Sequence, residues 1–458
     1  MATTFSSVLE GVRARFPALR AAGDREIFFD NAAGAQVPDE VVDAMRDHLV
    51  ARNVQRGGRY PRSREVDAAI EGAREILAAF LNAPFADEVV FGLNSTSLIR
   101  MVAESLRPAL RTGDRIVVTD LDHEANVGPW LRLESSGVTP LVWKVRGPGA
   151  TLEMDDLRVL LGSAGGPVRL VAMPLASNAT GGIVDVAAAA RLAREAGAWT
   201  FVDAVHFAPH GPIDVRVLGA DFLAFSGYKI FGPHVGFLWG RREALRALTP
   251  AREFFIQGGA PYAFEGGTQV YEGIAGMAGA MRYLSSLGTS ASGANELDPA
   301  STRRGASESD LSFTRSLDRR PALVRAMSLI REYESDLART MLRTLREIPE
   351  LRILGESDPE RASKRIPTFS FRIDGLTPAA IVERLAAEGI HARDGHMYAP
   401  RLIEAVGIDP MTGVCRVSLC HYNTPAEIDR FAETIRAVTD HGAHGPDRSS
   451  GGPPQARR

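Results

Sequence analysis

The stretch that decides the fold is "FLAFSGYKIFGPHVGFLWG", residues 222–240. Two apolar runs, each of strand length, are joined by a short segment with Lys229 at its centre. Burying a lysine without a partner is costly, because loss of hydration disfavours the ammonium form. A lysine whose pKa is lowered in this way can form a Schiff base with a carbonyl compound. The stretch therefore predicts a chemical role for Lys229.

The sequence before this stretch alternates apolar strands with helices. The predicted strands are residues 87–92, 114–120, 168–178 and 199–206 and the two runs within 222–240. This alternation predicts an α/β layer with a mainly parallel sheet. Ligands bind such sheets at the carboxyl ends of the strands. His123, Asn178, Asp203 and Lys229 all fall at predicted strand ends, so we expect a shared site there.

The domain organisation follows from changes in composition. The predicted divisions are an N-terminal segment (1–25) able to pack on the C-terminal domain, a large domain (26–284), a flexible Ser/Gly/Arg-rich insertion (285–320), a smaller C-terminal α+β domain (321–440) and a disordered tail (441–458). The insertion and the tail are assigned from their polar composition and lack of periodicity.

The composition excludes several classes of protein. The chain has 458 residues and a net charge of -3, which does not suit a nucleic-acid binder. Its two cysteines, Cys415 and Cys420, are too few for a disulfide framework or a zinc site. No apolar run reaches the roughly 18 residues that a membrane span needs, and the first residues lack a secretory pattern. We expect a cytoplasmic protein with no membrane partner.

Pyridoxal phosphate (PLP) is the common cofactor that a buried lysine holds, and the sequence offers further partners for it. Asp203 could pair with the pyridine nitrogen, or it could be an ordinary turn residue. The hydroxyls of Ser95, Thr96 and Ser97 stand where a helix begins and suit a phosphate, although one of them could simply cap the helix. His123 could stack on the cofactor ring or be a plain core histidine. No metal site is expected, because Pro209 breaks the helix that His206 and His210 would need.

Taken together, these stretches resemble the class V aminotransferase group of PLP fold-type I enzymes, and most closely the cysteine desulfurase-like proteins. The resemblance runs from residue 28 to residue 431, apart from the insertion. It rests on five motifs in the family's order: "DHEANVGPW", "SNATGGI", "DAVHFAPH", "SGYKIFGP" and "FEGGT". It implies the aminotransferase-like fold, PLP as cofactor, a small amino-acid substrate and a homodimer.

The resemblance also implies roles for single residues. Lys229 would form the Schiff base, Asp203 would pair with the pyridine nitrogen and His123 would stack on the ring. Asn178 and His206 would lie near the phenolic oxygen, although a Gln is usual where His206 stands. Thr96, Ser226 and Tyr228 would hold the phosphate beside Ser95 and Ser97 of the helix start, with Tyr228 in place of a more usual His and Thr268 reaching across the dimer interface. Arg416 would clamp the substrate carboxylate, and Asn31 and Arg56 would lie on the substrate side; a solvated loop explains the charges around Arg56 equally well.

One motif departs from the family pattern. Desulfurases carry a mobile cysteine in Arg-Thr-Gly-His-x-Cys-Ala, whereas residues 392–402 read "ARDGHMYAPRL" and place Tyr398 at that position. Cys415 and Cys420 are poorly placed to substitute. Side chains alternate along a strand, so Cys415 would face away from a site that Arg416 faces, and Cys420 would lie about 13 Å further along the same face. We therefore expect a lyase that cleaves cysteine or a cysteine S-conjugate by β-elimination, with Tyr398 or His396 protonating the leaving group. An aminotransferase, an epimerase, a desulfurase with another nucleophile and a non-catalytic PLP-binding protein remain alternatives.

Overall fold

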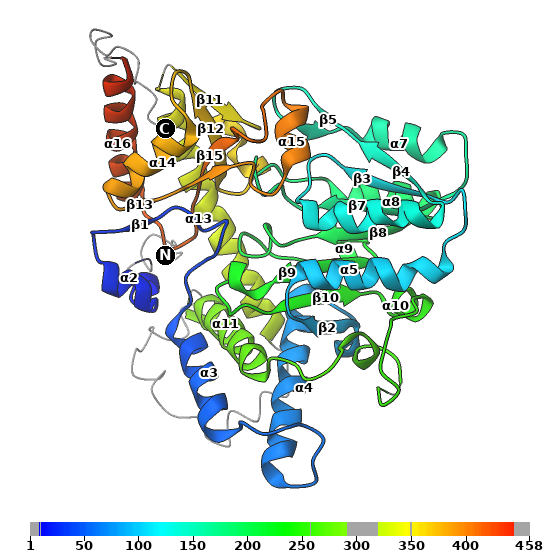
Figure 1. The fold of residues 1–458 in the computed structure, drawn as a ribbon. Coiled ribbons are helices and arrows are strands. Elements are labelled where there is room, and N and C mark those ends of the chain that lie inside the picture. The colour runs from blue at the N-terminus through cyan, green and yellow to red at the C-terminus, as the bar shows by residue number, and fades with distance from the viewer. Residues whose placement is uncertain (1–8, 10, 257, 291–318, 349, 444–458) are drawn as a thin grey trace, which may run out of the picture.

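The structure is a computed structural model that describes the chain except residues 1–8, 10, 257, 291–318, 349 and 444–458. Its centre is a seven-stranded sheet in the order β2-β10-β9-β8-β7-β3-β4 (Figure 1). The strands are β2 (Val89–Gly92), β3 (Arg115–Thr119), β4 (Thr139–Trp143), β7 (Val168–Pro174), β8 (Trp199–Asp203), β9 (Phe222–Ser226) and β10 (Gly236–Gly240). Only β10 runs antiparallel to its neighbours. The predicted mainly parallel sheet is confirmed.

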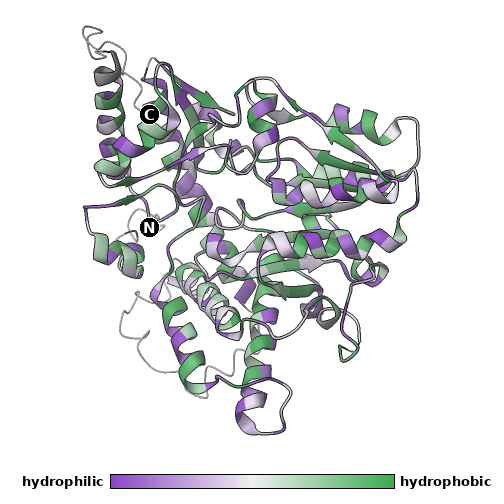
Figure 2. Cartoon of the chain, in the orientation of Figure 1, coloured by the Kyte–Doolittle hydropathy of each residue, from purple (hydrophilic) through white to green (hydrophobic). Residues whose placement is uncertain are grey.

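Both faces of this sheet are covered, which explains why its strands are apolar along their whole length. Val202, Leu223 and Phe225 belong to the core on one face, which they share with residues of helices α4 (Pro61–Leu81) and α11 (Tyr271–Ser290). The residues that alternate with them belong to the core on the opposite face, under helix α5 (Ser95–Leu106). Figure 2 shows this as predominantly hydrophobic strands between helices that carry hydrophilic residues on their outer sides.

The smaller domain is a four-stranded antiparallel sheet in the order β11-β12-β15-β14. Its strands are β11 (Leu351–Leu354), β12 (Thr368–Ile373), β14 (Arg393–Gly395) and β15 (Val414–Ser418), and its helices are α13 (Arg320–Arg346), α14 (Pro378–Ala387), α15 (Pro400–Ala405) and α16 (Pro425–Ala443). The remaining longer elements are α3 (Asp39–Ala51), α7 (Met154–Gly162), α8 (Val186–Glu195) and α10 (Arg242–Ala247).

The N-terminal segment packs on the smaller domain. After α2 (Pro17–Ala22), strand β1 (Ile27–Phe28) pairs in parallel with β13 (Ile390–His391). Arg13 donates a hydrogen bond of 2.6 Å to the backbone oxygen of Tyr422. The segment then enters the large domain at α3, so it connects the two domains.

The boundaries of the predicted insertion and tail differ from the observed elements. Helix α11 continues to Ser290, past the end of the predicted large domain at residue 284. Its Ser- and Gly-rich end is helical because small side chains let it approach α13: a Cβ on Gly288 would overlap the backbone oxygen of Ala322. Residues 291–318 and 444–458 lie outside the described residues, while α16 extends to Ala443.

None of the helices in the described part of the chain combines the length and the apolar character that a membrane span needs.

Candidate active site

Four strands of the large sheet bring the predicted polar residues together at their carboxyl ends. His123 follows β3, Asn178 follows β7, Asp203 is the last residue of β8 and Lys229 follows β9. Because β3, β7, β8 and β9 are parallel neighbours, all four residues lie at one edge of the sheet. The sheet therefore gathers the four side chains in one place, as their positions in the sequence predict.

Lys229 is buried, with 7% of its surface exposed. Its Nζ donates a hydrogen bond to the backbone oxygen of Ala32 and lies 4.8 Å from the centre of the Tyr228 ring. Burial, followed by the nearby Arg416 guanidinium, lowers the pKa of Lys229 to about 7. At neutral pH a large share of this amine is therefore unprotonated and able to act as a nucleophile or a base.

Asp203 lies beside a second buried carboxyl group that the sequence did not single out. Its Oδ1 accepts a hydrogen bond of 2.9 Å from the backbone nitrogen of Val205. Burial raises the pKa of Asp203, and both burial and Asp203 itself raise the pKa of Asp122. Asn126 donates a hydrogen bond of 2.6 Å to Asp122. Ionising both of two neighbouring buried carboxyl groups is unfavourable, so the pair favours binding a proton or a cationic partner.

The two histidines of the site are neutral. Burial, followed by Lys229, lowers the pKa of His123 to about 4 and lowers the pKa of His206 well below its usual range. Nδ1 of His123 accepts a hydrogen bond of 3.0 Å from the backbone nitrogen of Ala125, which leaves the proton on Nε2. A neutral, fixed imidazole at this position suits stacking on a flat ring.

The loop that carries Tyr398 docks directly on the His123 turn. The Tyr398 and His123 ring centres are 5.5 Å apart, and the backbone nitrogen of Glu124 donates a hydrogen bond of 2.8 Å to the backbone oxygen of Tyr398. Arg401 forms an ion pair of 3.2 Å with Glu124. His396 Nδ1 accepts a hydrogen bond from the backbone nitrogen of Tyr398. Tyr398 is 60% exposed, so its side chain lies at the mouth of the site and can reach solvent.

Two buried polar atoms in the site have no partner among the described residues. Asn178 Nδ2 donates a hydrogen bond of 2.5 Å to the backbone oxygen of Met397. The Oδ1 of the same side chain is buried and has no hydrogen-bond partner. Arg416 donates one bond of 3.0 Å to the backbone oxygen of Asn178, and its buried Nε has no partner. Unpaired buried polar groups are costly. One acceptor and one donor on neighbouring residues therefore indicate a ligand that satisfies both.

The predicted phosphate residues divide into two groups. Ser226 Oγ lies 3.0 Å from Ser95 Oγ, so the end of β9 meets the start of α5. Thr96 is half-buried at the same helix start. Ser97 instead forms a reciprocal capping box with Asn94, which the sequence reading overlooked as the cap. Its hydroxyl donates to the Asn94 backbone oxygen at 2.8 Å, so the structure gives Ser97 a capping role.

Tyr228 is half-buried and stacks on His234, with ring centres 4.8 Å apart. Its ring is also the one that Lys229 faces. The aromatic pair borders the lysine, where the resemblance places the phosphate.

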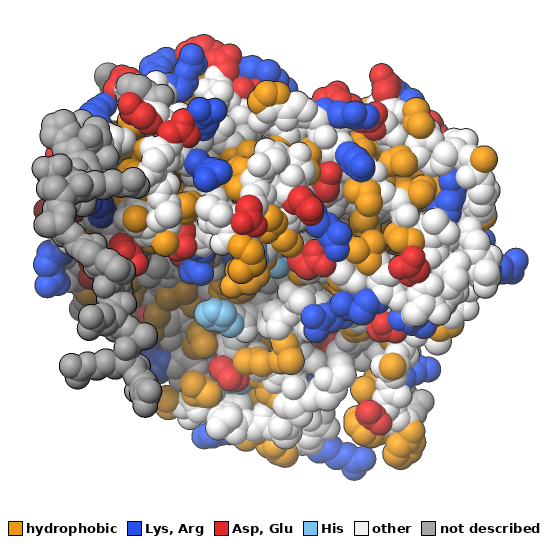
Figure 3. All heavy atoms as spheres, turned by 45° about the horizontal axis from the view of Figure 1, so that its top comes forward, with side chains coloured by type: hydrophobic (Ala, Val, Ile, Leu, Met, Phe, Trp, Pro, Cys, Tyr) orange, Lys and Arg blue, Asp and Glu red, His pale blue; other side chains and the backbone are white. Residues whose placement is uncertain are grey.

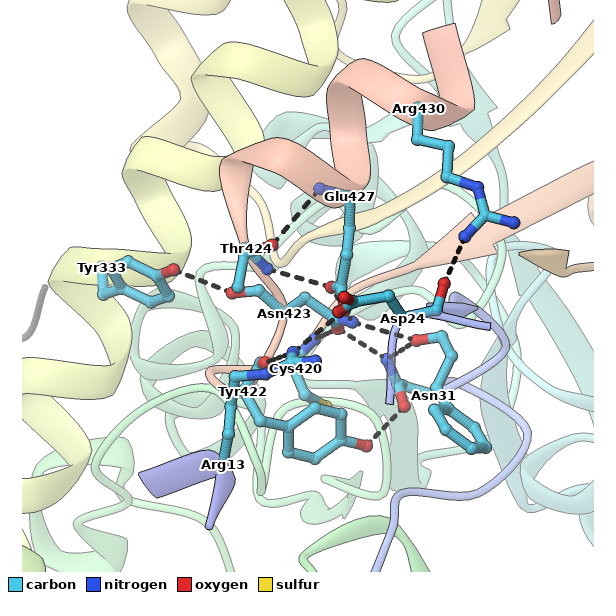
Figure 4. A network of polar contacts seen from close by, with 11 residues as sticks. Arg13, Asp24, Asn31, Tyr333, Cys420, Tyr422, Asn423, Thr424, Glu427 and Arg430 are labelled. Carbon is cyan, nitrogen blue, oxygen red and sulfur yellow. Dashed lines mark hydrogen bonds and ion pairs between the residues drawn. The ribbon is translucent and has the colours of Figure 1, made fainter. Parts of the chain in front are cut away.

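The side-chain nitrogen and oxygen of Asn31 are both hydrogen-bonded within the chain. Its amide nitrogen donates to the backbone oxygens of Phe28 and Ser418 and to Asn423, and its Oδ1 accepts a hydrogen bond of 2.5 Å from the Tyr422 hydroxyl. Figure 4 shows these contacts joining the N-terminal segment to the start of α16. In place of the expected contact with substrate, Asn31 holds two parts of the chain together.

Arg56 and the loop that carries Thr268 lie beside one cavity, which Lys229 does not line. Arg56 pairs with Asp67 at 3.1 Å and lies over the Tyr262 ring. It lines a cavity of about 300 Å³ together with Gly267 and Gln269 of the loop that carries the exposed Thr268. Among the described residues, no hydrogen bond or ion pair joins either of them to Lys229. The role across a dimer interface predicted for Thr268 and the substrate-side role predicted for Arg56 stay predictions.

Asp30 and Arg393, which the sequence reading missed, complete the site. Asp30 Oδ2 accepts hydrogen bonds of 2.9 and 2.8 Å from Arg393, and its Oδ1 accepts one of 3.3 Å from Arg416. Both lie inside stretches already noted, "FFDNAAG" and "ARDGHMY", but nothing local indicates that they meet. In the described part of the chain, no cluster of His, Cys, Asp and Glu residues suits a metal ion.

Residues 27–304 and 324–431 match the family model of the aminotransferases of class V. The chain belongs to this family. The aminotransferase-like protein FGM3 of Gibberella zeae is 32% identical over 439 residues, which cover 94% of this chain and 98% of that protein. A probable cysteine desulfurase of Streptomyces coelicolor is 31% identical, with 94% and 96% covered.

Solved structures of class V enzymes have the same fold. The apo cysteine desulfurase of Thermococcus onnurineus NA1 is similar with a TM-score of 0.79 at 26% identity, covering 94% of this chain and 98% of the other. The cysteine desulfurase CsdA of Escherichia coli gives a TM-score of 0.75 at 27% identity and the same coverage. The aminotransferase-like architecture predicted from the sequence is confirmed.

As a class V family member, the chain is a PLP-dependent enzyme. The residues present fit this cofactor: a buried lysine amine, a buried carboxyl pair for a pyridinium, a neutral histidine, and the unpartnered Asn178 Oδ1. The thiols of the chain bear on which class V reaction it supports. Cys415 and Cys420, the only cysteines of the chain, are both buried, and burial raises both thiol pKa values. Since the thiolate is the nucleophile, neither is suited to attack a substrate sulfur.

Proposed function

We propose that this class V enzyme cleaves the C–S bond of cysteine or a cysteine S-conjugate by β-elimination. The observation that carries the proposal is Tyr398, whose ring packs on His123 at the mouth of the site and which stands, by the resemblance of its motif, where desulfurases carry their cysteine. Without a reactive thiol, the sulfur must leave with its electron pair, as β-elimination requires. The proposal includes a homodimer that binds a small amino acid.

In this scheme each side chain has a defined task. Arg416 holds the substrate carboxylate with donors beyond those it already uses. Asp203 holds a proton at the pyridine nitrogen. When bound, PLP supplies an electron sink conjugated to the substrate Cα. Lys229, as the free amine, takes the Cα proton.

The sulfur then leaves from Cβ. The electron pair of the broken Cα–H bond forms the Cα–Cβ double bond, and the pair of the broken Cβ–S bond departs with the thiolate. Tyr398 or His396, whose ring centres are 6.0 Å apart at the mouth of the site, gives the thiolate a proton. The released enamine hydrolyses to pyruvate and ammonia.

The second subunit would contribute Thr268. Its loop is anchored by a buried ion pair of 2.7 Å between Glu265 and Arg74, while Gly266, Gly267 and Thr268 are exposed. A rigid base with an exposed tip suits a loop that reaches into a neighbouring site. Arg56 donates a hydrogen bond to the hydroxyl of Tyr262, which lies just before this loop in the chain. In the dimer, Arg56 would then face the substrate bound in the partner subunit.

The direct test is the stoichiometry of products from a simple S-alkyl cysteine. The purified, PLP-loaded protein should release one thiol and one pyruvate for each substrate consumed, and a Lys229→Ala variant should release neither. Transfer of the amino group to an added keto acid, or inversion at Cα without thiol release, would contradict the proposal and assign the site to transamination or epimerisation.

A further inference from the structure

The segment of residues 28–36 contacts both the catalytic lysine and the small domain. On one side, the backbone oxygen of Ala32 accepts the hydrogen bond from Lys229, and the backbone nitrogen of Ala35 donates one of 3.0 Å to the backbone oxygen of Tyr228. On the other side, the segment forms a parallel bridge between Asp30 and Ser418. A charged residue in this segment therefore sits between the cofactor site and the substrate-binding strand.

That residue is Asp30, and its two partners face each other. Arg393 on β14 and Arg416 on β15 are paired residues of the antiparallel ladder. Like charges directly opposite each other on neighbouring strands are destabilising. The Asp30 carboxylate lies between the two guanidiniums, with one oxygen on each. One carboxylate between two guanidiniums leaves the group with a net positive charge, which suits an anionic substrate group.

The position of Asp30 is itself fixed by its neighbour. Asn31 is locked by Tyr422 and Asn423, and Glu427 accepts a hydrogen bond of 2.9 Å from Asn423 and pairs with Arg13 (Figure 4). This cluster leaves Asp30 little freedom to move relative to β15. The buried network therefore holds the carboxylate against Arg416 before any substrate arrives.

We propose that Asp30 is a positioning residue: it orients Arg416 for the substrate carboxylate and shields Lys229 from the two guanidiniums. A pocket of about 420 Å³ lined by Asp30, Gln36, His391 and Arg393 opens beside the carboxylate. The inference rests on the proposed function only in giving Arg416 the substrate carboxylate. It does not depend on which bond beyond Cα is broken.

The pKa of Lys229 depends on the positions of Asp30, Arg393 and Arg416. The ionisable groups that act on Lys229, or on which it acts, come from every element around it: Asp30, His123, Asp203, His206, Arg393, Arg416 and the buried Cys420. Within this set Asp30 raises the pKa of Lys229, whereas Arg416 and Arg393 lower it. Removing Asp30 or Arg393 should therefore shift the pKa of the lysine in opposite directions, which general damage to the site would not do.

The experiment compares Asp30→Asn and Arg393→Gln with the wild type. The first readout needs no substrate: the rate at which the apo-protein captures PLP, followed by absorbance as a function of pH. The inflection should move to lower pH in Asp30→Asn and to higher pH in Arg393→Gln. The second readout is steady-state kinetics, in which Asp30→Asn should raise KM about tenfold with a much smaller change in kcat, as expected for the loss of one charge-assisted contact.

The matched control is Asp374→Asn, which removes an ion pair of 2.7 Å with Arg352 on the exposed surface of the small domain and should change neither readout. Equal shifts in both variants, or no shift in either, would overturn the proposal. If Asp30→Asn does not fold, Arg393→Gln alone decides, because the Asn31 cluster is left intact. Since PLP capture involves no substrate, a failure of the β-elimination assignment would leave this result unaffected.

Discussion

The edge of the large sheet and the loop at residues 396–399 face the same site but differ in how closely they follow the sequence pattern of desulfurases. The sheet edge carries Lys229, Asp203 and His123 at the ends of neighbouring parallel strands, where we propose that they hold PLP. The loop carries Tyr398, which packs on His123 and stands at the position where the resemblance to desulfurases places their cysteine. Under the proposed mechanism, the difference means that the cofactor's electron sink is kept while the group that meets the leaving sulfur has changed. On the face shown in Figure 3, acidic and basic side chains are interspersed, so local contacts matter more than a broad surface field.

The largest effect is expected at the sheet edge. A Lys229→Ala variant should lose at least about 10³-fold in turnover, because the nucleophile and the base are the same group. Turnover of an S-alkyl cysteine and the absorbance of bound PLP measure it. Substantial turnover in this variant would remove the whole scheme.

Replacement of Asp203 should come next. Asp203→Asn should lower kcat by about 10²-fold or more, because the pyridine nitrogen would lose the carboxylate that keeps its proton. The matched control is Asp122→Asn, which removes the neighbouring carboxyl and should lower the pKa of Asp203 without removing the partner of the ring. Equal losses in the two variants would contradict the separate roles given to this pair.

On the loop side, Tyr398→Phe should lower kcat by about tenfold to a hundredfold, the range for loss of a general acid. The effect should shrink for substrates with good leaving groups, which need no proton. A comparison of two S-substituted cysteines of different thiol acidity measures this. Full activity of Tyr398→Phe on every accepted substrate would assign the proton to another group.

The pH dependence of PLP capture should follow the ionisation of Lys229 at the sheet edge. The pKa of Lys229 is lowered to about 7, so the free amine predominates above that pH and falls about tenfold per unit below it. The rate of PLP capture by the apo-protein should therefore rise with pH and level off above about 7. A rise centred near the ordinary lysine value would show that Lys229 is not desolvated in solution.

The smallest effect is expected at the thiols. Cys415→Ser and Cys420→Ser should each change turnover less than about twofold, since neither thiolate takes part. Thermal unfolding serves as the companion measurement, because serine in a buried apolar position costs stability without touching the chemistry. A selective loss of turnover in one folded variant would reveal the nucleophile of a desulfurase.

The same comparison separates what the sequence predicted from what it could not. The sheet edge was predictable because strand ends are local features and parallel neighbours bring them together. The cap at Asn94 was missed, because Ser95, Thr96 and Ser97 were the only residues considered as caps and any of several polar residues can begin a helix. The bridge from Asp30 to Arg416 spans 386 positions and has no local signature. Asn31 was assigned to the substrate from its motif, although only the fold shows that its amide is already satisfied.

The central claim is that a PLP site without a reactive thiol directs sulfur out by β-elimination. The most direct measurement is the ratio of pyruvate to alanine that the wild-type holoenzyme forms from L-cysteine. We expect pyruvate with an equal amount of sulfide and little alanine. Alanine as the main product would contradict the account, because it requires a nucleophile that takes the sulfur from the substrate.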